Sequence, residues 1–62
     1  MKETTINKIK EGEFFKLALN GRVYVRGGYD RYFREYSYFD FDNVNREHFC
    51  CGNKKVLVDF EF

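Results

Sequence analysis

The sequence predicts an all-β fold in one small domain, residues 1–62. Two observations carry this prediction: short runs of alternating apolar and polar residues, and turn residues that separate these runs every 8–12 positions. We expect a five-stranded antiparallel barrel or strongly bent sheet, with one or two single helical turns. An SH3-like barrel is the first choice, and an OB-fold, which usually needs a longer chain and an inserted helix, is the second.

The first expected element is a helical turn near the N-terminus. Thr5 is a suitable N-cap residue for a turn through Ile6 and Ile9, and Gly12 is suited to end it.

A tight β-hairpin is predicted next. Residues 13–19 and 22–26 alternate in polarity, and Asn20-Gly21 lies between them. Asn-Gly is the favoured dipeptide of a two-residue hairpin turn because both residues tolerate positive φ.

The alternation also predicts which side chains face the core of this hairpin. Phe15, Leu17 and Leu19 share the core face of the first strand. On the second strand Val23 and Val25 are expected to point inward, and Tyr24 and Arg26 outward. Gly27-Gly28 then predicts a bulge or bend at the end of the second strand.

Strands are also predicted over residues 36–41 and 55–62. The last strand places Val56, Val58, Phe60 and Phe62 on one face. Residues 47–51 are expected to pair with it as a hairpin, because Gly52 and Asn53 supply turn residues between them. Residues 42–47 carry capping residues followed by a Glu, which predicts a second helical turn.

Composition excludes several classes of protein. Eleven Lys and Arg balance ten Asp and Glu, so a net charge of +1 gives little attraction to a polyanion. No segment has the apolar stretch of a signal peptide or the roughly 20 apolar residues of a membrane span. We therefore expect a soluble, cytoplasmic protein that does not enter a membrane.

Three segments together carry a resemblance to a known group of proteins. They are residues 10–15 (KEGEFF), residues 23–31 (VYVRGGYDR) and the closing Val56-x-Val58-Asp59-Phe60-x-Phe62. In these segments the chain resembles a group of small uncharacterised all-β proteins of Bacteroides-type gut bacteria and of their phages and mobile elements. The resemblance spans nearly the whole chain, and residues 23–31 are its most specific part. It implies a short all-β domain, with no established activity and no functional residues to carry over.

No metal, cofactor or catalytic site is predicted. His48, Cys50 and Cys51 are the only clustered metal-type ligands, but adjacent cysteines on a strand point to opposite faces and do not form the two spaced pairs of a zinc site. His48 and Cys50 share a face, yet no third residue is evident to orient the pair as a nucleophile and base. Reduced thiols are expected in a cytoplasmic chain.

The candidate interaction surface is rich in Arg and Tyr. A structural explanation comes first: Arg stems cover aromatic rings, and Asp30 fixes a turn while pairing with Arg31 or Arg34. Among binding functions, protein interaction or self-association as a homodimer ranks above single-stranded nucleic-acid binding, which uses stacked bases and basic residues. The candidate residues are Tyr24, Arg26, Tyr29, Arg31, Tyr32, Arg34, Tyr36 and Tyr38.

Overall fold

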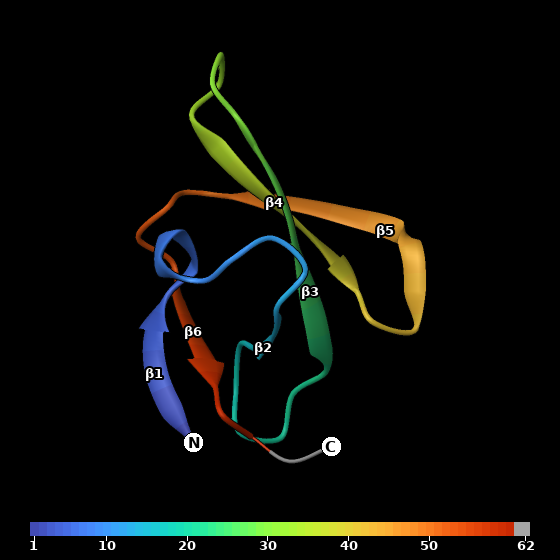
Figure 1. Cartoon of the computed structure of the whole chain (residues 1–62). Coiled ribbons are helices and arrows are strands. Elements are labelled where there is room, and N and C mark those ends of the chain that lie inside the picture. The colour runs from blue at the N-terminus through green and yellow to red at the C-terminus, as the bar shows by residue number, and fades with distance from the viewer. Residues whose placement is uncertain (61–62) are drawn as a thin grey trace.

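The computed structural model describes residues 1–60, apart from the side chain of Val44. Within that range the chain is all-β, with one antiparallel sheet and a single 3-10 turn (Figure 1). In chain order the elements are β1 (Lys2–Thr5), η1 (Ile6–Lys8), β2 (Phe14–Lys16), β3 (Val23–Asp30), β4 (Glu35–Asp40), β5 (Asn43–Cys50) and β6 (Lys55–Val58).

The sheet has six strands in the order β1-β6-β2-β3-β4-β5, so the predicted number of five is wrong. The extra strand is β1, which lies antiparallel to β6. Its residues, Lys-Glu-Thr-Thr, show no alternation of apolar and polar side chains, so periodicity gives no signal for it. Among residues 1–60 no pairing joins β1 to β5, so the sheet is not closed into a barrel.

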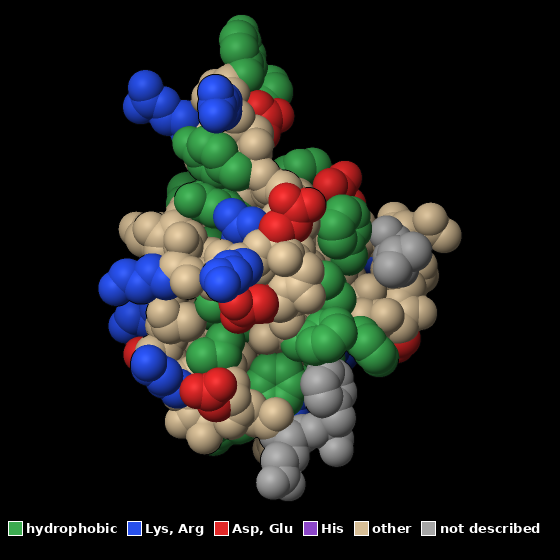
Figure 2. Space-filling model, in the orientation of Figure 1, with side chains coloured by type: hydrophobic (Ala, Val, Ile, Leu, Met, Phe, Trp, Pro, Cys, Tyr) green, Lys and Arg blue, Asp and Glu red, His purple; other side chains and the backbone are tan. Residues whose placement is uncertain are grey.

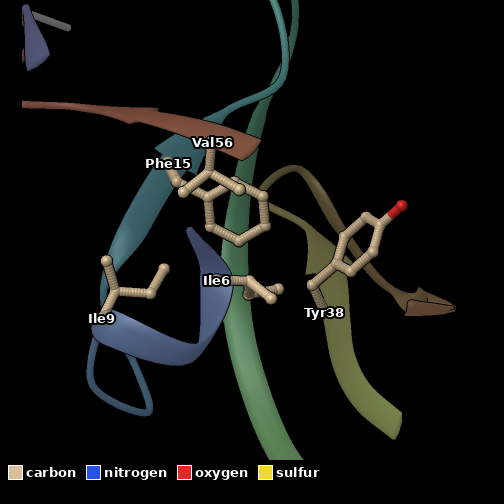
Figure 3. Close-up of a cluster of buried hydrophobic side chains, with 5 residues drawn as sticks. All are labelled: Ile6, Ile9, Phe15, Tyr38 and Val56. Carbon is tan, nitrogen blue, oxygen red and sulfur yellow. The ribbon is translucent and has the colours of Figure 1, made fainter. Parts of the chain in front are cut away.

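A small apolar core lies against one face of the sheet. It consists of Ile6, Ile9, Phe15, Tyr38 and Val56 (Figure 3). A turn is present near Thr5, as predicted: η1 places Ile6 in this core, and the backbone N–H of Ile9 donates to the Ile6 carbonyl. Its expected ends are wrong, because the Thr5 side chain makes no capping hydrogen bond and the turn ends at Ile9, not at Gly12. Figure 3 shows the Tyr38 hydroxyl pointing away from the other four side chains.

Tyr24 and Val25 of β3 point to the opposite faces of the sheet from those predicted. Phe15 and Tyr24 are directly opposite each other in the β2–β3 pair, so their side chains share a face. Phe15 is fully buried, and the Tyr24 ring stacks on it with centroids 5.8 Å apart. Val25 is opposite Phe14 and Phe39 on the other face of the sheet. The expectation that Tyr24 points outward is therefore wrong.

The connection between β2 and β3 is longer than the predicted two-residue turn. Lys16 is the last residue of β2 and pairs with Val23, which leaves residues 17–22 as the loop. The turn within this loop is closed by the Gly21 N–H, which donates to the Ala18 carbonyl at 3.0 Å. Leu19, expected on the core face, is 67% exposed.

The predicted bulge at Gly27-Gly28 is confirmed. The pairing of β3 with β4 shifts register between Arg26 and Tyr29. A Cβ on Gly27 would collide with the Ser37 hydroxyl and lie 2.7 Å from the Phe39 ring. The close approach of β4 at this point requires a residue without a side chain.

Residues 42–47 do not form the predicted helical turn. β5 begins at Asn43, whose side-chain oxygen accepts a hydrogen bond from the Asn45 N–H, so the residue that resembled a helix cap makes a local turn instead. β5 then runs beside β4, with Phe39 opposite Glu47.

The predicted hairpin between residues 47–51 and the last strand is also wrong. β6 pairs with β1 and β2, not with β5. It ends at Val58, and Asp59, at φ 58°, takes the chain out of the extended conformation. Phe60 therefore follows the strand, and the predicted position of Phe62 lies outside the described residues.

Candidate functional site

The predicted Arg- and Tyr-rich surface is divided between the core and the end of a hairpin. Tyr24 and Tyr38 lie on the core-facing side, and Tyr38 is only 8% exposed. Tyr36 and Arg26 are half-buried beside them. The remaining four residues are exposed on the β3–β4 hairpin: Tyr29, Arg31, Tyr32 and Arg34.

The core-facing tyrosines form part of an aromatic cluster. The Tyr38 ring packs edge-on against Tyr24, at 5.3 Å, and against Phe15, at 5.5 Å. The His48 ring stacks on its other side, at 5.0 Å. Burial raises the pKa of the Tyr38 hydroxyl, with a smaller effect from neighbouring acidic groups. These rings are packed against each other and do not present an open stacking surface.

Arg26 is held within the fold. Its guanidinium lies 4.7 Å from the Tyr36 ring centroid, and its Nη1 donates to the Gly27 carbonyl at 3.0 Å. Its Nε is buried and has no acceptor among the described residues. The Tyr36 ring also contacts Tyr29, at 4.6 Å. Arg26 thus covers an aromatic ring and uses one of its guanidinium nitrogens to hold the backbone at the bulge.

The end of the β3–β4 hairpin is built around Asp30. Its Oδ1 accepts hydrogen bonds from the backbone N–H groups of Tyr32, at 2.9 Å, and Phe33, at 3.2 Å. Arg34 then adopts a positive φ of 56° and returns the chain to β4. Asp30 fixes the turn as expected, but it makes no ion pair with Arg31 or Arg34 in the described part of the chain.

The side chain of Asp40, at the end of β4, is a buried carboxylate that the sequence did not single out. Asp40 is 2% exposed, and its carboxylate lies 2.8 Å from His48 Nε2 and 3.4 Å from Arg22 Nη1. The hydrogen bond from His48 is the main reason that the pKa of Asp40 lies below its usual value; Arg46 and Arg22 act in the same direction. Asp40 and His48 are eight positions apart, and no short motif links them.

His48 and Cys50 lie on the same face of β5, and no hydrogen bond joins the His48 ring to the Cys50 thiol among the described residues. His48 Nε2 is engaged with Asp40, and Cys50 is opposite Tyr36. Burial raises the pKa of the Cys50 thiol, which disfavours the thiolate needed for nucleophilic attack. Both cysteines are free, and the described residues contain no group of three or more His, Cys, Asp or Glu placed to hold a metal ion.

A concavity lies on the other side of β4 and β5, away from the core. We call it the acidic hollow; it has a volume of about 330 Å³, and a second depression of about 230 Å³ adjoins it at Phe33. Its walls include three carboxylates and several aromatic rings, and no Lys or Arg of the described chain lines it. The residues are Gly28, Tyr29, Asp30, Glu35, Ser37, Phe39, Glu47 and Phe49, with Phe33 in the adjoining depression.

Strand pairing explains why these side chains meet. Ser37 is opposite Phe49, and Phe39 is opposite Glu47, so alternate residues of β4 and β5 point into the acidic hollow. The intervening residues, such as Tyr38 and His48, point to the core. Sequence analysis missed this site because it assigned residues 42–47 to a helical turn and paired residues 47–51 with the wrong strand.

Comparison with known protein families, curated proteins and solved structures finds no significant match to the chain. No helix in the described residues has the length and apolar character needed to cross a membrane; η1 has three residues.

Proposed function

We propose that this chain is a non-catalytic protein-interaction module whose binding site is the acidic hollow. The observation that carries the proposal is the combination of Asp30, Glu35 and Glu47 with the rings of Phe39 and Phe49 around one concavity. Such walls suit a polypeptide segment that presents Lys or Arg side chains with apolar neighbours.

The physical basis is complementarity of charge and surface. A cation near an aromatic face gains about 0.5–1 kcal/mol at an exposed site and about 2 kcal/mol when water is excluded. Nearby carboxylates add ion pairs, and apolar surface adds burial. Phe49 is 56% exposed and Phe33 is 66% exposed, so both offer area that a partner can cover.

The absence of catalysis is part of the proposal. Asp40 orients the His48 ring, but no hydrogen bond joins that ring to Cys50 in the described part of the chain, and the pKa of the Cys50 thiol is raised, so the thiol is not activated as a nucleophile.

Single-stranded nucleic-acid binding is the second candidate function. It is favoured by the exposed Arg31, Tyr32 and Arg34 at the end of the hairpin. It ranks lower because Tyr24 and Tyr38 pack with the core, and because the carboxylates of Asp30 and Glu35 flank the same hairpin end.

An NMR titration tests the proposal. The isotope-labelled protein receives either a capped peptide of Lys, Arg and Gly or the same peptide with Glu in place of every Lys and Arg. We expect the cationic peptide alone to shift the amide signals of Phe39, Glu47 and Phe49. Glu35→Gln with Glu47→Gln should weaken binding, whereas Glu3→Gln with Glu11→Gln, a matched change at exposed sites far along the chain, should not.

The same protein is titrated with a single-stranded oligonucleotide at low and high salt. If the oligonucleotide binds and the cationic peptide does not, with affinity that falls steeply as salt rises, the second function replaces the first. If neither ligand binds, the acidic hollow is not a site for cationic segments.

The proposal has three broader parts: an SH3-like architecture, a cytoplasmic setting, and an origin in a phage or mobile element. The SH3-like architecture would require β1 and β5 to close the sheet, which amide exchange of the β5 edge would test. The cytoplasmic setting is supported by the two free cysteines. An origin in a phage or mobile element is supported by the resemblance over residues 23–31.

A further inference from the structure

The β3–β4 hairpin extends beyond the body of the molecule (Figure 1). Figure 2 shows hydrophobic and Lys or Arg side chains together at its end, with an Asp or Glu side chain beside them and others further down. Tyr32 is 87% exposed and its ring packs only edge-on against Phe33, at 4.9 Å. Such rings on a projecting arm mark a surface that gains stability when another polypeptide covers it.

The turn of this hairpin and the acidic hollow that adjoins it are opposite in charge. The hairpin end carries two arginines, Arg31 and Arg34, and no acidic residue between them. The acidic hollow begins directly beside them: Asp30 and Glu35 adjoin the two arginines in the chain, and Glu47 lies further along, on β5. Within one molecule these groups do not satisfy each other, because every ion pair found among residues 1–60 involves Asp40.

We infer that the partner of the acidic hollow is a second copy of this chain. Two hairpins packed face to face and antiparallel place the hairpin end of each copy, with Arg31 and Arg34, against the acidic hollow of the other. The contact is two-fold symmetric, so each arginine–carboxylate contact occurs twice, as in the commonest kind of homodimer. This inference rests on the proposed function, since it names the cationic segment that the acidic hollow receives.

A second copy is favoured over an unrelated basic partner because one chain carries both halves of the interface, on the β3–β4 hairpin and on the adjoining strand β5. Tyr32 and Phe33 accompany the arginines, so the same contact covers exposed rings and pairs charges. The net charge of +1 produces little repulsion between copies. The interface differs from the one expected from sequence, which used Tyr24, Tyr36 and Tyr38; Tyr38 is buried, and Tyr24 packs against Phe15.

Sedimentation equilibrium of charge-reversed variants tests the dimer. One variant carries Arg31→Glu and Arg34→Asp, where Asp suits the positive φ of position 34. The other carries Glu35→Lys and Glu47→Lys, and Asp30 is kept because it holds the turn. We expect the natural protein to dimerise, with weaker association at high salt, and each variant alone to be monomeric.

Mixing the two variants is the decisive step. In the mixture each reversed hairpin end meets a reversed hollow, and each natural end meets a natural hollow, so a heterodimer should form. Exposed sites elsewhere provide matched controls: Lys8→Glu with Lys10→Glu, and Glu3→Lys with Glu11→Lys, should dimerise like the natural protein. Dispersed amide signals from each variant would show that it is folded.

Two results would overturn the inference: a natural protein that stays monomeric, or a dimer that persists in folded charge-reversed variants. Failure of the inference is separable from failure of the proposed function. The Arg31→Glu, Arg34→Asp variant keeps its acidic hollow, so its titration with the cationic peptide reports on that site alone. If it binds the peptide while the natural protein is monomeric, the partner is a different basic protein.

Discussion

Asp40 is the residue whose environment departs most from that of a surface carboxylate. Its side chain is 3% exposed and is held by His48, Arg22 and Arg46. A buried carboxylate without such partners would be strongly unfavourable, so the hydrogen bonds from His48 and Arg22 and the nearby charge of Arg46 are what permit Asp40 to be buried at the end of β4.

This environment makes stability depend on pH at the acidic end. The pKa of Asp40 is lower in the folded protein than its ordinary value of about 3.9, chiefly through the His48 hydrogen bond. A depressed folded pKa stabilises the protein above the unfolded value, and this contribution disappears as the pH falls through the folded pKa. We therefore expect Asp40→Asn to lower the unfolding midpoint at neutral pH, with a difference from the natural protein that shrinks below about pH 4. Urea unfolding of both proteins at a series of pH values measures this difference. A difference that stays constant with pH would contradict the lowered pKa of Asp40.

Gly27 gives a second prediction at the level of a single residue. A methyl group there would overlap the Ser37 hydroxyl and the Phe39 ring, so Gly27→Ala should destabilise the fold by about 1–3 kcal/mol, as overpacking does. Its neighbour is the control, because a Cβ on Gly28 meets no atom within 4 Å. Gly28→Ala should be close to neutral in thermal unfolding. Equal effects at both positions would show that the bulge does not bring β4 against Gly27.

At the scale of the elements, the sequence predicts correctly those features whose signal lies in their own residues. The strand over residues 36–41, the turn near Ile6 and the bulge at Gly27-Gly28 all appear close to their predicted places. The strand follows from local alternation and the bulge from paired glycines, whereas Thr5, the expected cap of the turn, makes no capping hydrogen bond.

The wrong predictions concern which face a side chain occupies and which strands pair, and both depend on a neighbouring strand. Tyr24 points to the core because the β2–β3 register places it opposite Phe15, although Val23 and Val25 are more apolar. The acidic hollow likewise exists only because β5 pairs with β4, so Glu35 and Glu47 are recognisable as one site only after the partner of residues 47–50 is known.

The short central strand β2 should be the element on which stability depends most. It joins β6 to β3, and Phe15 is its fully buried side chain. Phe15→Ala should cost about 3–5 kcal/mol, comparable to the roughly 3–5 kcal/mol that a core of this size supplies, so the variant should lose its dispersed NMR spectrum. Leu19→Ala, in the exposed loop after β2, should change the free energy of unfolding by no more than about 0.5 kcal/mol.

Phe60 follows β6 and is half-buried, so Phe60→Ala should lower the free energy of unfolding less than Phe15→Ala does. The opposite order would mean that the C-terminal segment completes the core.

For the whole molecule, two faces of one sheet have different roles. One face holds the five-residue core, and the other carries the acidic hollow and exposed rings. A domain of about 60 residues buries only about 60% of the surface that its unfolded chain exposes, and small domains often rely on disulfides, a metal or a partner for stability. We therefore ask which of the three, a disulfide, a metal or a partner, stabilises this chain.

We predict that neither a metal nor a disulfide provides this support. Cys50 and Cys51 are free, and the described chain brings no three potential ligands together. Addition of a chelator or a mild reductant should therefore leave the thermal unfolding midpoint unchanged, as followed by circular dichroism. Protein concentration is the contrasting variable: ligands and partners that bind only the folded state raise the midpoint by mass action, so association through the hairpins makes the midpoint rise with concentration. A midpoint that falls on adding a chelator would assign His48 and the cysteines to a metal site, and one that falls with the reductant would assign the thiols to a disulfide between chains.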